Sequence, residues 1–220
     1  MFAYVLMIFA IIGIFFSFTN LIPLQIGGIP NDGLNARNCK TNPQTRRAMW
    51  IQLKYAALLT QGVTPRNMPE EWTQNIGEIT DGILGFLPCL HYNRLMDHQS
   101  GEDARAYLQH VLDNPGKMAD LHQNELRGEL LFHELINENR AEIVESMYTP
   151  ELQANMKLLK THLSLLRLQY AYTLLYSKDG QKAKKIRETF DKTCKTTPFA
   201  GDIDNERYWM QMVNFAANPH

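Results

Sequence analysis

The sequence predicts a mainly α protein, with one N-terminal transmembrane helix followed by an all-α domain of stacked helical hairpins. Three observations lead to this prediction. The first nineteen residues, Met1 to Thr19, carry no charge. All 22 Lys and Arg residues, and all but one of the 23 acidic residues, lie after residue 36. From Pro43 onward, apolar residues recur at helical spacing, without the sustained alternation that marks a half-buried strand.

The segment 1–19 is predicted to span a membrane. At about 1.5 Å per helical residue it covers roughly 28 Å, close to the thickness of the bilayer hydrocarbon. A cleaved signal peptide is one alternative, but it would start with basic residues, and the first basic residue here is Arg37. A buried core helix is the other alternative. The unbroken Phe, Ile and Leu around the whole helix favour lipid instead.

The charge pattern also predicts an orientation. Basic residues follow the apolar segment closely and none precedes it: Arg37, Lys40, Arg46, Arg47 and Lys54. An excess of Lys and Arg on one side of a membrane helix marks the cytoplasmic side, so the helical part is expected in the cytoplasm. The three widely spaced cysteines, Cys39, Cys89 and Cys194, form no C-x-x-C pair and fit a reducing compartment. Because positive and negative charges balance after residue 36, electrostatic capture of nucleic acid is not expected.

The pattern divides the chain into four regions. These are a transmembrane helix at 1–19, a broken segment at 20–42, a juxtamembrane helix with an irregular linker at 43–90, and a helical domain at 91–220. The clearest helix is expected from Glu151 to Tyr176, where apolar residues recur at steps of four and three. Further helices are expected at 45–60, 101–112, 119–137, 141–148, 181–194 and 205–217. Stacked hairpins of this kind are loosely similar to tetratricopeptide arrays, although no internal repeat is recognisable.

The helical part shows little catalytic chemistry. The stretch HELIN, from His133 to Asn137, misses the second histidine of the zinc-protease pattern H-E-x-x-H, so His133 is expected on a helix surface or at a packing gap. The carboxylates of this region are expected on solvated helix faces: Glu102, Asp103, Glu125, Glu129, Glu134 and Glu138. The basic run at 182–187 is likewise expected to be a solvated face. Alone, this part looks like a scaffold.

The stretch NLIPLQIGGIPNDG, from Asn20 to Gly33, is the strongest candidate for a site. Charged groups in or near a bilayer are costly, so an Asp placed there normally has a partner such as a metal ion. Backbone that is not helical at membrane depth must be buried in protein or line a polar cavity. If the stretch already lies outside the lipid, Asp32 and Gly33 form only a turn.

The motif itself resembles a known family. Asn20-Leu21-Ile22-Pro23 followed by Asp32-Gly33 is similar to the second signature of site-2-protease-like intramembrane zinc metalloproteases, peptidase family M50. The resemblance implies that Asp32 is a zinc ligand. It also implies that Asn20, Pro23, Gly27, Gly28 and Gly33 shape the broken segment, and that the backbone from Leu24 to Ile29 meets an extended substrate.

The resemblance covers about 35 residues, and the chain contains no H-E-x-x-H. One Asp is too few ligands for catalytic zinc, which usually takes three from the protein and a water. The sequence is therefore expected to be the C-terminal part of such a protease, with the upstream part supplying the histidines and the general base. It would arise from a fragment, a mis-started reading frame or a split gene. The alternative is a single-pass membrane-anchored helical scaffold that binds a cytoplasmic protein partner.

Overall fold

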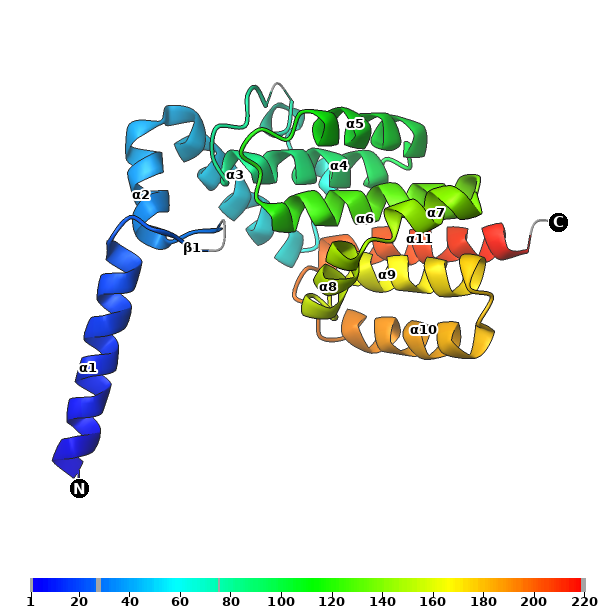
Figure 1. Ribbon diagram of the computed structural model, residues 1–220. Helices are drawn as coiled ribbons and strands as arrows, with labels where there is room; N and C mark the ends of the chain where they lie inside the picture. Colours follow the sequence, from blue (N-terminus) through cyan, green and yellow to red (C-terminus); the bar gives the residue numbers. More distant parts are fainter. Residues whose placement is uncertain (1, 27–28, 75, 219–220) are drawn as a thin grey trace.

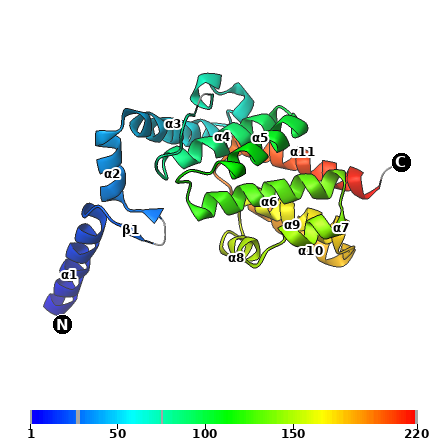
Figure 2. The same ribbon diagram turned by 45° about the horizontal axis from the view of Figure 1, so that its top comes forward.

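The computed structural model describes residues 2–26, 29–74 and 76–218. The chain begins with α1 (Phe2–Leu21), which leads away from the body as a separate helix (Figures 1 and 2). Its mean hydropathy of 2.3 and its length of 20 residues make it apolar and long enough to span a membrane. No described residue of α1 is buried, so the alternative of a core helix finds no support in the fold.

A short hairpin and two helices connect α1 to the body. The strands β1 (Gln25–Ile26) and β2 (Ile29–Pro30) pair antiparallel, with Gln25 opposite Pro30. They are followed by α2 (Asp32–Thr41) and α3 (Pro43–Thr60). Asn42 separates the two helices, and its side chain accepts a hydrogen bond from the backbone of Gln44, which caps α3. The helix expected at 45–60 is therefore present as α3 and begins two residues earlier than predicted.

The linker after α3 is irregular, as its Pro and Gly content indicated. It contains three 3-10 turns, η1 (Pro65–Asn67), η2 (Glu70–Trp72) and η3 (Leu84–Phe86). The last of these leads directly into α4 (Leu87–Asp97), so the helical body starts slightly before residue 91.

The remaining elements form the body of the molecule. In chain order they are α5 (Gly101–Asp113), α6 (Asp120–Asn137), α7 (Ala141–Met147), α8 (Pro150–Leu158), α9 (Leu163–Ala171), the π-helical segment η4 (Tyr172–Tyr176), α10 (Gly180–Cys194) and α11 (Ala200–Ala217). Helices α4, α5 and α6 pack in sequence, and α9 packs against α6, α10 and α11 (Figure 1). The mainly α fold is confirmed. The likeness to tetratricopeptide arrays stays a prediction.

The single helix expected from Glu151 to Tyr176 is wrong. The chain leaves the helix after Leu158, turns through residues 159–162 and starts again at Leu163. No Pro or Gly marks this break, and the steps of four and three continue across it. We attribute the break to packing, because α8 and α9 both pack on α6 while α9 also packs closely on α10 and α11. Tertiary contacts of this kind override local helix preference.

The core is centred on α9, which is buried on most of its circumference. Seven of its nine residues are buried: Leu163, Leu165, Leu166, Arg167, Leu168, Tyr170 and Ala171. Around it lie buried residues of neighbouring helices, including Phe132 of α6, Phe190 of α10 and Met210 of α11. An arginine at the centre of such a core requires partners, because an unpaired buried charge is strongly destabilising.

Candidate functional site

The end of α1 and the start of α2 meet in a corner that a single side chain, Asn31, holds together. Its amide oxygen accepts hydrogen bonds from the backbone N–H groups of Leu24 and Leu34, both at 3.0 Å. Its amide NH₂ donates to the carbonyls of Thr19 and Ile22. Asn31 thereby caps α2 and pairs carbonyls left without a helical partner at the end of α1. Asn20 was expected to shape this segment. The structure gives that role to Asn31, which occupies the N-cap position of α2.

Gly33 allows the two helices to approach closely. A Cβ atom at this position would lie 2.3 Å from the carbonyl oxygen of Leu21 and 2.8 Å from that of Asn20. Both are backbone atoms, which cannot turn away as a flexible side chain can. Close packing of α2 on the end of α1 therefore explains why the Asp-Gly pair of the motif has a glycine at position 33.

Asp32 occupies the first position of α2, with its side chain exposed. Among the described residues its carboxylate has no hydrogen-bond or ion-pair partner. The other predicted site residues lie nearby: Asn20 is exposed in the last turn of α1, and Pro23 is exposed just after it. Gly27 and Gly28 lie outside the described residues. The corner therefore presents Asp32 to its surroundings, and among the described residues Asp32 belongs to no cluster of three or more metal-ligating groups.

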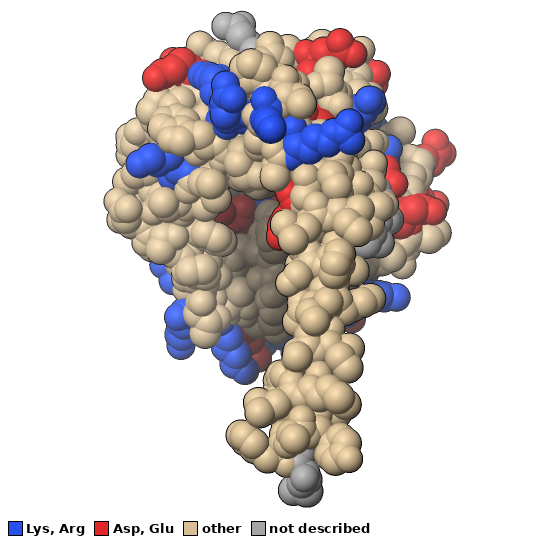
Figure 3. Space-filling model, turned by 90° about the vertical axis from the view of Figure 1, so that its left-hand side faces the viewer, with Lys and Arg blue, Asp and Glu red and all other residues tan. Residues whose placement is uncertain are grey.

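The surface of α1 carries no charge up to this corner. Figure 3 shows the helix as an uncharged stalk, with Lys and Arg side chains on the part of the body above it. The charged residues closest in sequence are Asp32 at the corner itself and Arg37 and Lys40 on α2. Asp32 is thus the first charge after the apolar helix.

A buried ionic network, which the sequence pattern did not reveal, lies in the body. Arg167, only 2% exposed, donates two hydrogen bonds to Glu129 at 2.7 and 2.9 Å and one to Glu206 at 2.8 Å. Its guanidinium carbon also lies 3.9 Å from the centre of the Phe132 ring. Burial opposes its charge, but the two carboxylates hold the pKa of Arg167 above its ordinary value. The network ties α6, α9 and α11 together.

The structure corrects two expectations about α6. Glu129 and Glu134 are not on a solvated face, since both are buried. Glu134 pairs with Arg140 at 2.7 Å. Among the described residues, Arg167, Glu129 and Glu206 bond to one another across three helices, so we assign the network a structural role.

His133 is also buried, so the surface position expected as one alternative is wrong. Its Nε2 atom lies 3.2 Å from the Tyr92 hydroxyl, which itself donates to Glu129 at 2.7 Å. Because the Tyr92 hydroxyl hydrogen is directed at Glu129, we assign the Nε2–H tautomer to His133. Its N–H then donates a hydrogen bond to the Tyr92 oxygen. The Nδ1 atom has no partner among the described residues. Burial, with smaller contributions from Arg167 and Arg105, lowers the pKa of His133 to about 3.

The depressed pKa of His133 predicts a pH dependence of stability. Below its ordinary pKa of 6.5 the unfolded chain binds a proton that the folded chain does not accept until about pH 3. Stability is therefore lost as pH falls through this range, by at most about 1.4 kcal/mol per pH unit for one group. His133→Gln is expected to reduce the slope of the unfolding free energy between about pH 4 and pH 6, measured by chemical denaturation.

His98→Gln is the matched control for this measurement, because His98 is exposed at the end of α4. It is expected to leave the slope unchanged. Burial and the neighbouring Glu206 raise the pKa of Asp202 to about 7, which acts in the opposite direction. The stabilising contribution of Asp202 is lost as pH rises. Because both variants contain Asp202, the difference between their slopes measures the contribution of His133. Equal slopes in His133→Gln and the wild type would contradict the prediction.

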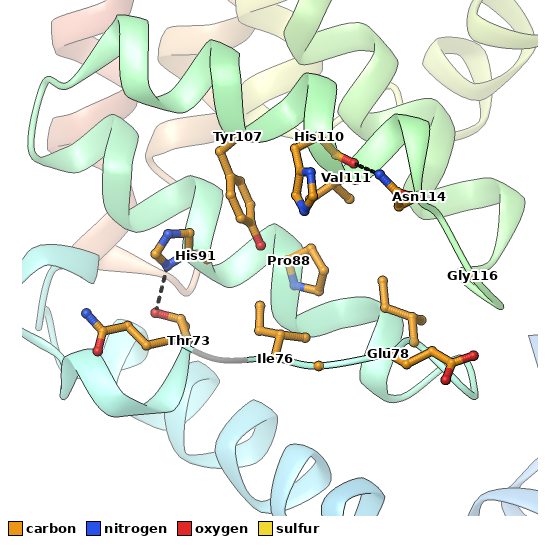
Figure 4. Close-up of a pocket in the computed structure, with 13 residues that line it drawn as sticks. Thr73, Ile76, Glu78, Pro88, His91, Tyr107, His110, Val111, Asn114 and Gly116 are labelled. Atoms are coloured by element: carbon orange, nitrogen blue, oxygen red, sulfur yellow. Dashed lines mark hydrogen bonds between the residues drawn. The ribbon is translucent and has the colours of Figure 1, made fainter.

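A pocket of about 880 Å³ lies where the extended segment at 76–79 faces α4 and α5 (Figure 4). His91 bonds to Thr73 at 3.2 Å, and its ring meets that of Tyr107 edge-on. Burial lowers the pKa of His91, so this imidazole is neutral near pH 7. The wall is mixed, with Ile76 and Val111 beside these polar groups. Such a wall is suited to binding and contains no nucleophile held by a base and a third orienting group.

Comparison of the chain with known protein families, with curated proteins and with solved structures finds no match. The class of protein therefore rests on the helical fold, the apolar helix α1 and the geometry of the corner at Asp32.

Proposed function

We propose that this chain is the C-terminal part of an intramembrane zinc metalloprotease. In this proposal Asp32 supplies one zinc ligand, and a segment with the pattern H-E-x-x-H supplies two histidines and the general base. The reaction is hydrolysis of a peptide bond in or near the bilayer by a metal-activated water. The helical body would lie in the cytoplasm, in keeping with the basic residues that follow α1.

The observation that carries the proposal is that Asn31 and Gly33 have structural roles in the corner, whereas Asp32 between them has none. Asn31 pairs the backbone groups of the corner, and Gly33 permits the close approach of α1 and α2. Asp32 does neither, so its carboxylate is available at the end of an apolar helix. A charge at that place is costly unless a cation or another partner neutralises it. A zinc ion held jointly with two histidines would provide that partner.

The hairpin next to Asp32 supports a role in substrate binding. The strands β1 and β2 form a two-stranded antiparallel sheet close to Asp32 in sequence. An extended peptide could add to one edge by backbone hydrogen bonds, which is how many proteins bind unfolded segments. An extended substrate strand would then lie within a few residues of the proposed ligand.

The test is the zinc content of the complete protein encoded at the locus, purified in detergent. Asp32→Asn keeps the shape of the side chain but removes the anionic ligand. It is expected to lower zinc affinity by about 10- to 100-fold or more, since even outer-shell changes have effects of that size. Cleavage of a transmembrane peptide reporter is expected to fall to background, while membrane insertion of α1 is unchanged.

Asp103→Asn is the matched control, because Asp103 is another exposed acid in the first turn of a helix, α5. It is expected to retain wild-type zinc binding and cleavage. Retention of both in Asp32→Asn would overturn the assignment of Asp32 as a ligand. The DNA preceding Met1 provides an independent test, since an in-frame H-E-x-x-H within hydrophobic helices is expected there or in a neighbouring gene.

A membrane-anchored helical scaffold is the second candidate function, and the pocket beside His91 favours it. Its mixed apolar and polar wall would suit a peptide segment of a cytoplasmic partner. This function predicts that Tyr107→Ala impairs partner binding, whereas Asp32→Asn has no effect on it. The two functions are therefore separated by which variant produces the loss.

A further inference from the structure

A second group of metal-ligating side chains lies in the helical body. Cys89 of α4 and His122 and Glu125 of α6 place their ligand atoms within 4.8 Å of one another. His122 Nδ1 and the Glu125 carboxylate are 3.1 Å apart. All three side chains are half-buried, and His122 and Glu125 remain 22% and 24% exposed. The group is therefore both preassembled and open to solvent.

The fold brings these residues together through a close contact between the starts of two helices. Gly85 precedes α4 and Met118 precedes α6, and a Cβ at Gly85 would lie 3.0 Å from the Cα of Met118. Cys89 is the third residue of α4, and His122 is the third residue of α6. On α6, His122 and Glu125 are three residues apart and share one face of the helix. The edge of the Phe86 ring against the His122 ring limits the freedom of that imidazole.

We propose that Cys89, His122 and Glu125 form a zinc site with three protein ligands and an exchangeable fourth position. A thiolate, an imidazole and a carboxylate together favour zinc over magnesium or calcium, which prefer oxygen ligands. A thiolate and a carboxylate neutralise a divalent cation, so a half-buried complex would carry no net charge. Three protein ligands leave room for a water or for a ligand from a partner protein.

A metal ion would bind Cys89 as a thiolate, because a coordinating thiol loses its proton. The starts of α4 and α6 carry partial positive charge, which favours the anionic thiolate and carboxylate themselves.

This site is independent of the one proposed at Asp32. Cys89 belongs to the helical body and follows Pro88, which lines the pocket beside His91. Zinc bound there would brace α4 against α6 next to that pocket. Such a zinc site would have a structural or regulatory role in the helical body.

Cobalt provides a direct test, because a thiolate bound to Co²⁺ gives a charge-transfer absorption in the near ultraviolet that oxygen and nitrogen ligands do not. The full chain in detergent is expected to develop this absorption when titrated with Co²⁺ and to lose it when Zn²⁺ is added. Cys89→Ser is expected to abolish it. Glu125→Gln and His122→Gln are expected to weaken Co²⁺ binding by at least about tenfold.

Cys39→Ser and Cys194→Ser are the matched controls and are expected to keep the absorption. Asp32→Asn is also expected to keep it, which separates this site from the proposed protease centre. Far-ultraviolet circular dichroism of each variant checks the fold, and the half-exposed His122 gives a variant that leaves the core intact. No thiolate absorption in the wild type at saturating Co²⁺, or an unchanged spectrum in Cys89→Ser, would overturn the proposal.

Discussion

Arg167→Ala is expected to destabilise the helical body by about 3–5 kcal/mol, because it removes one partner of a buried ion pair. Glu129 and Glu206 would remain in the core without their cation. The cation–π contact with Phe132 would also be lost. Unfolding of the full chain in detergent, followed by tryptophan fluorescence, to which the buried Trp209 contributes, measures the change. The midpoint in guanidinium should fall without a change in the slope of the transition.

The charge itself can be separated from packing by combined variants. Arg167→Met keeps most of the volume but still leaves two carboxylates unpaired, so it should remain strongly destabilised. Combining it with Glu129→Gln and Glu206→Gln removes all three charges and should recover part of the loss, as replacing a whole buried ionic group often does. Recovery would show that unpaired charge, more than lost volume, is responsible.

Arg187→Ala is the control, because Arg187 forms a more exposed ion pair with Asp191 one turn along α10. Pairs of this type contribute about 0.3–0.5 kcal/mol. A loss of less than about 1 kcal/mol in Arg167→Ala would contradict the assigned role of the network, since it would equal an ordinary surface change.

Gly33→Ala is expected to open the corner that presents Asp32. The added Cβ would lie 2.3 Å from the Leu21 carbonyl oxygen, so the backbone of α1 or α2 must move. Overpacking of this kind costs about 1–3 kcal/mol. Hydrogen exchange of peptides covering residues 20–41 measures it, because the amides of Leu24 and Leu34 are held by Asn31. Their exchange should accelerate roughly 5- to 150-fold.

Gly13→Ala provides the matched control, since Gly13 lies in α1 with no atom within 4 Å of an added Cβ. It should leave exchange at residues 20–41 unchanged. The helical body should be unaffected in both variants, because the corner is separate from its core. Wild-type exchange in Gly33→Ala would show that the close approach of α1 and α2 is not required for the corner.

Much of the helical fold could be predicted because local signals mark it. Asn42 and Pro43 start α3, and the turn at 114–116 separates α5 from α6. The break at 159–162 could not be predicted, since no Pro or Gly lies there and the break depends on which helices α8 and α9 pack against. A charged residue within an apolar helix, Arg167, was the available signal for the buried network. Its partners lie 38 and 39 residues away in sequence, beyond the reach of any local pattern.

The sequence by itself determined the apolar helix α1, the mainly α class and the motif around Asp32, because each depends on composition or on spacing along a single segment. Only the tertiary structure decided that Asn31 pairs the backbone of the corner and that Gly33 makes room for α1. It alone placed His133 and Glu129 in the core and brought Cys89 to His122 and Glu125. The physical reason is the same in each case. Hydrogen bonds, steric contacts and ligand clusters depend on distances between segments, and the periodicity of one segment carries no information about which other segment it will meet.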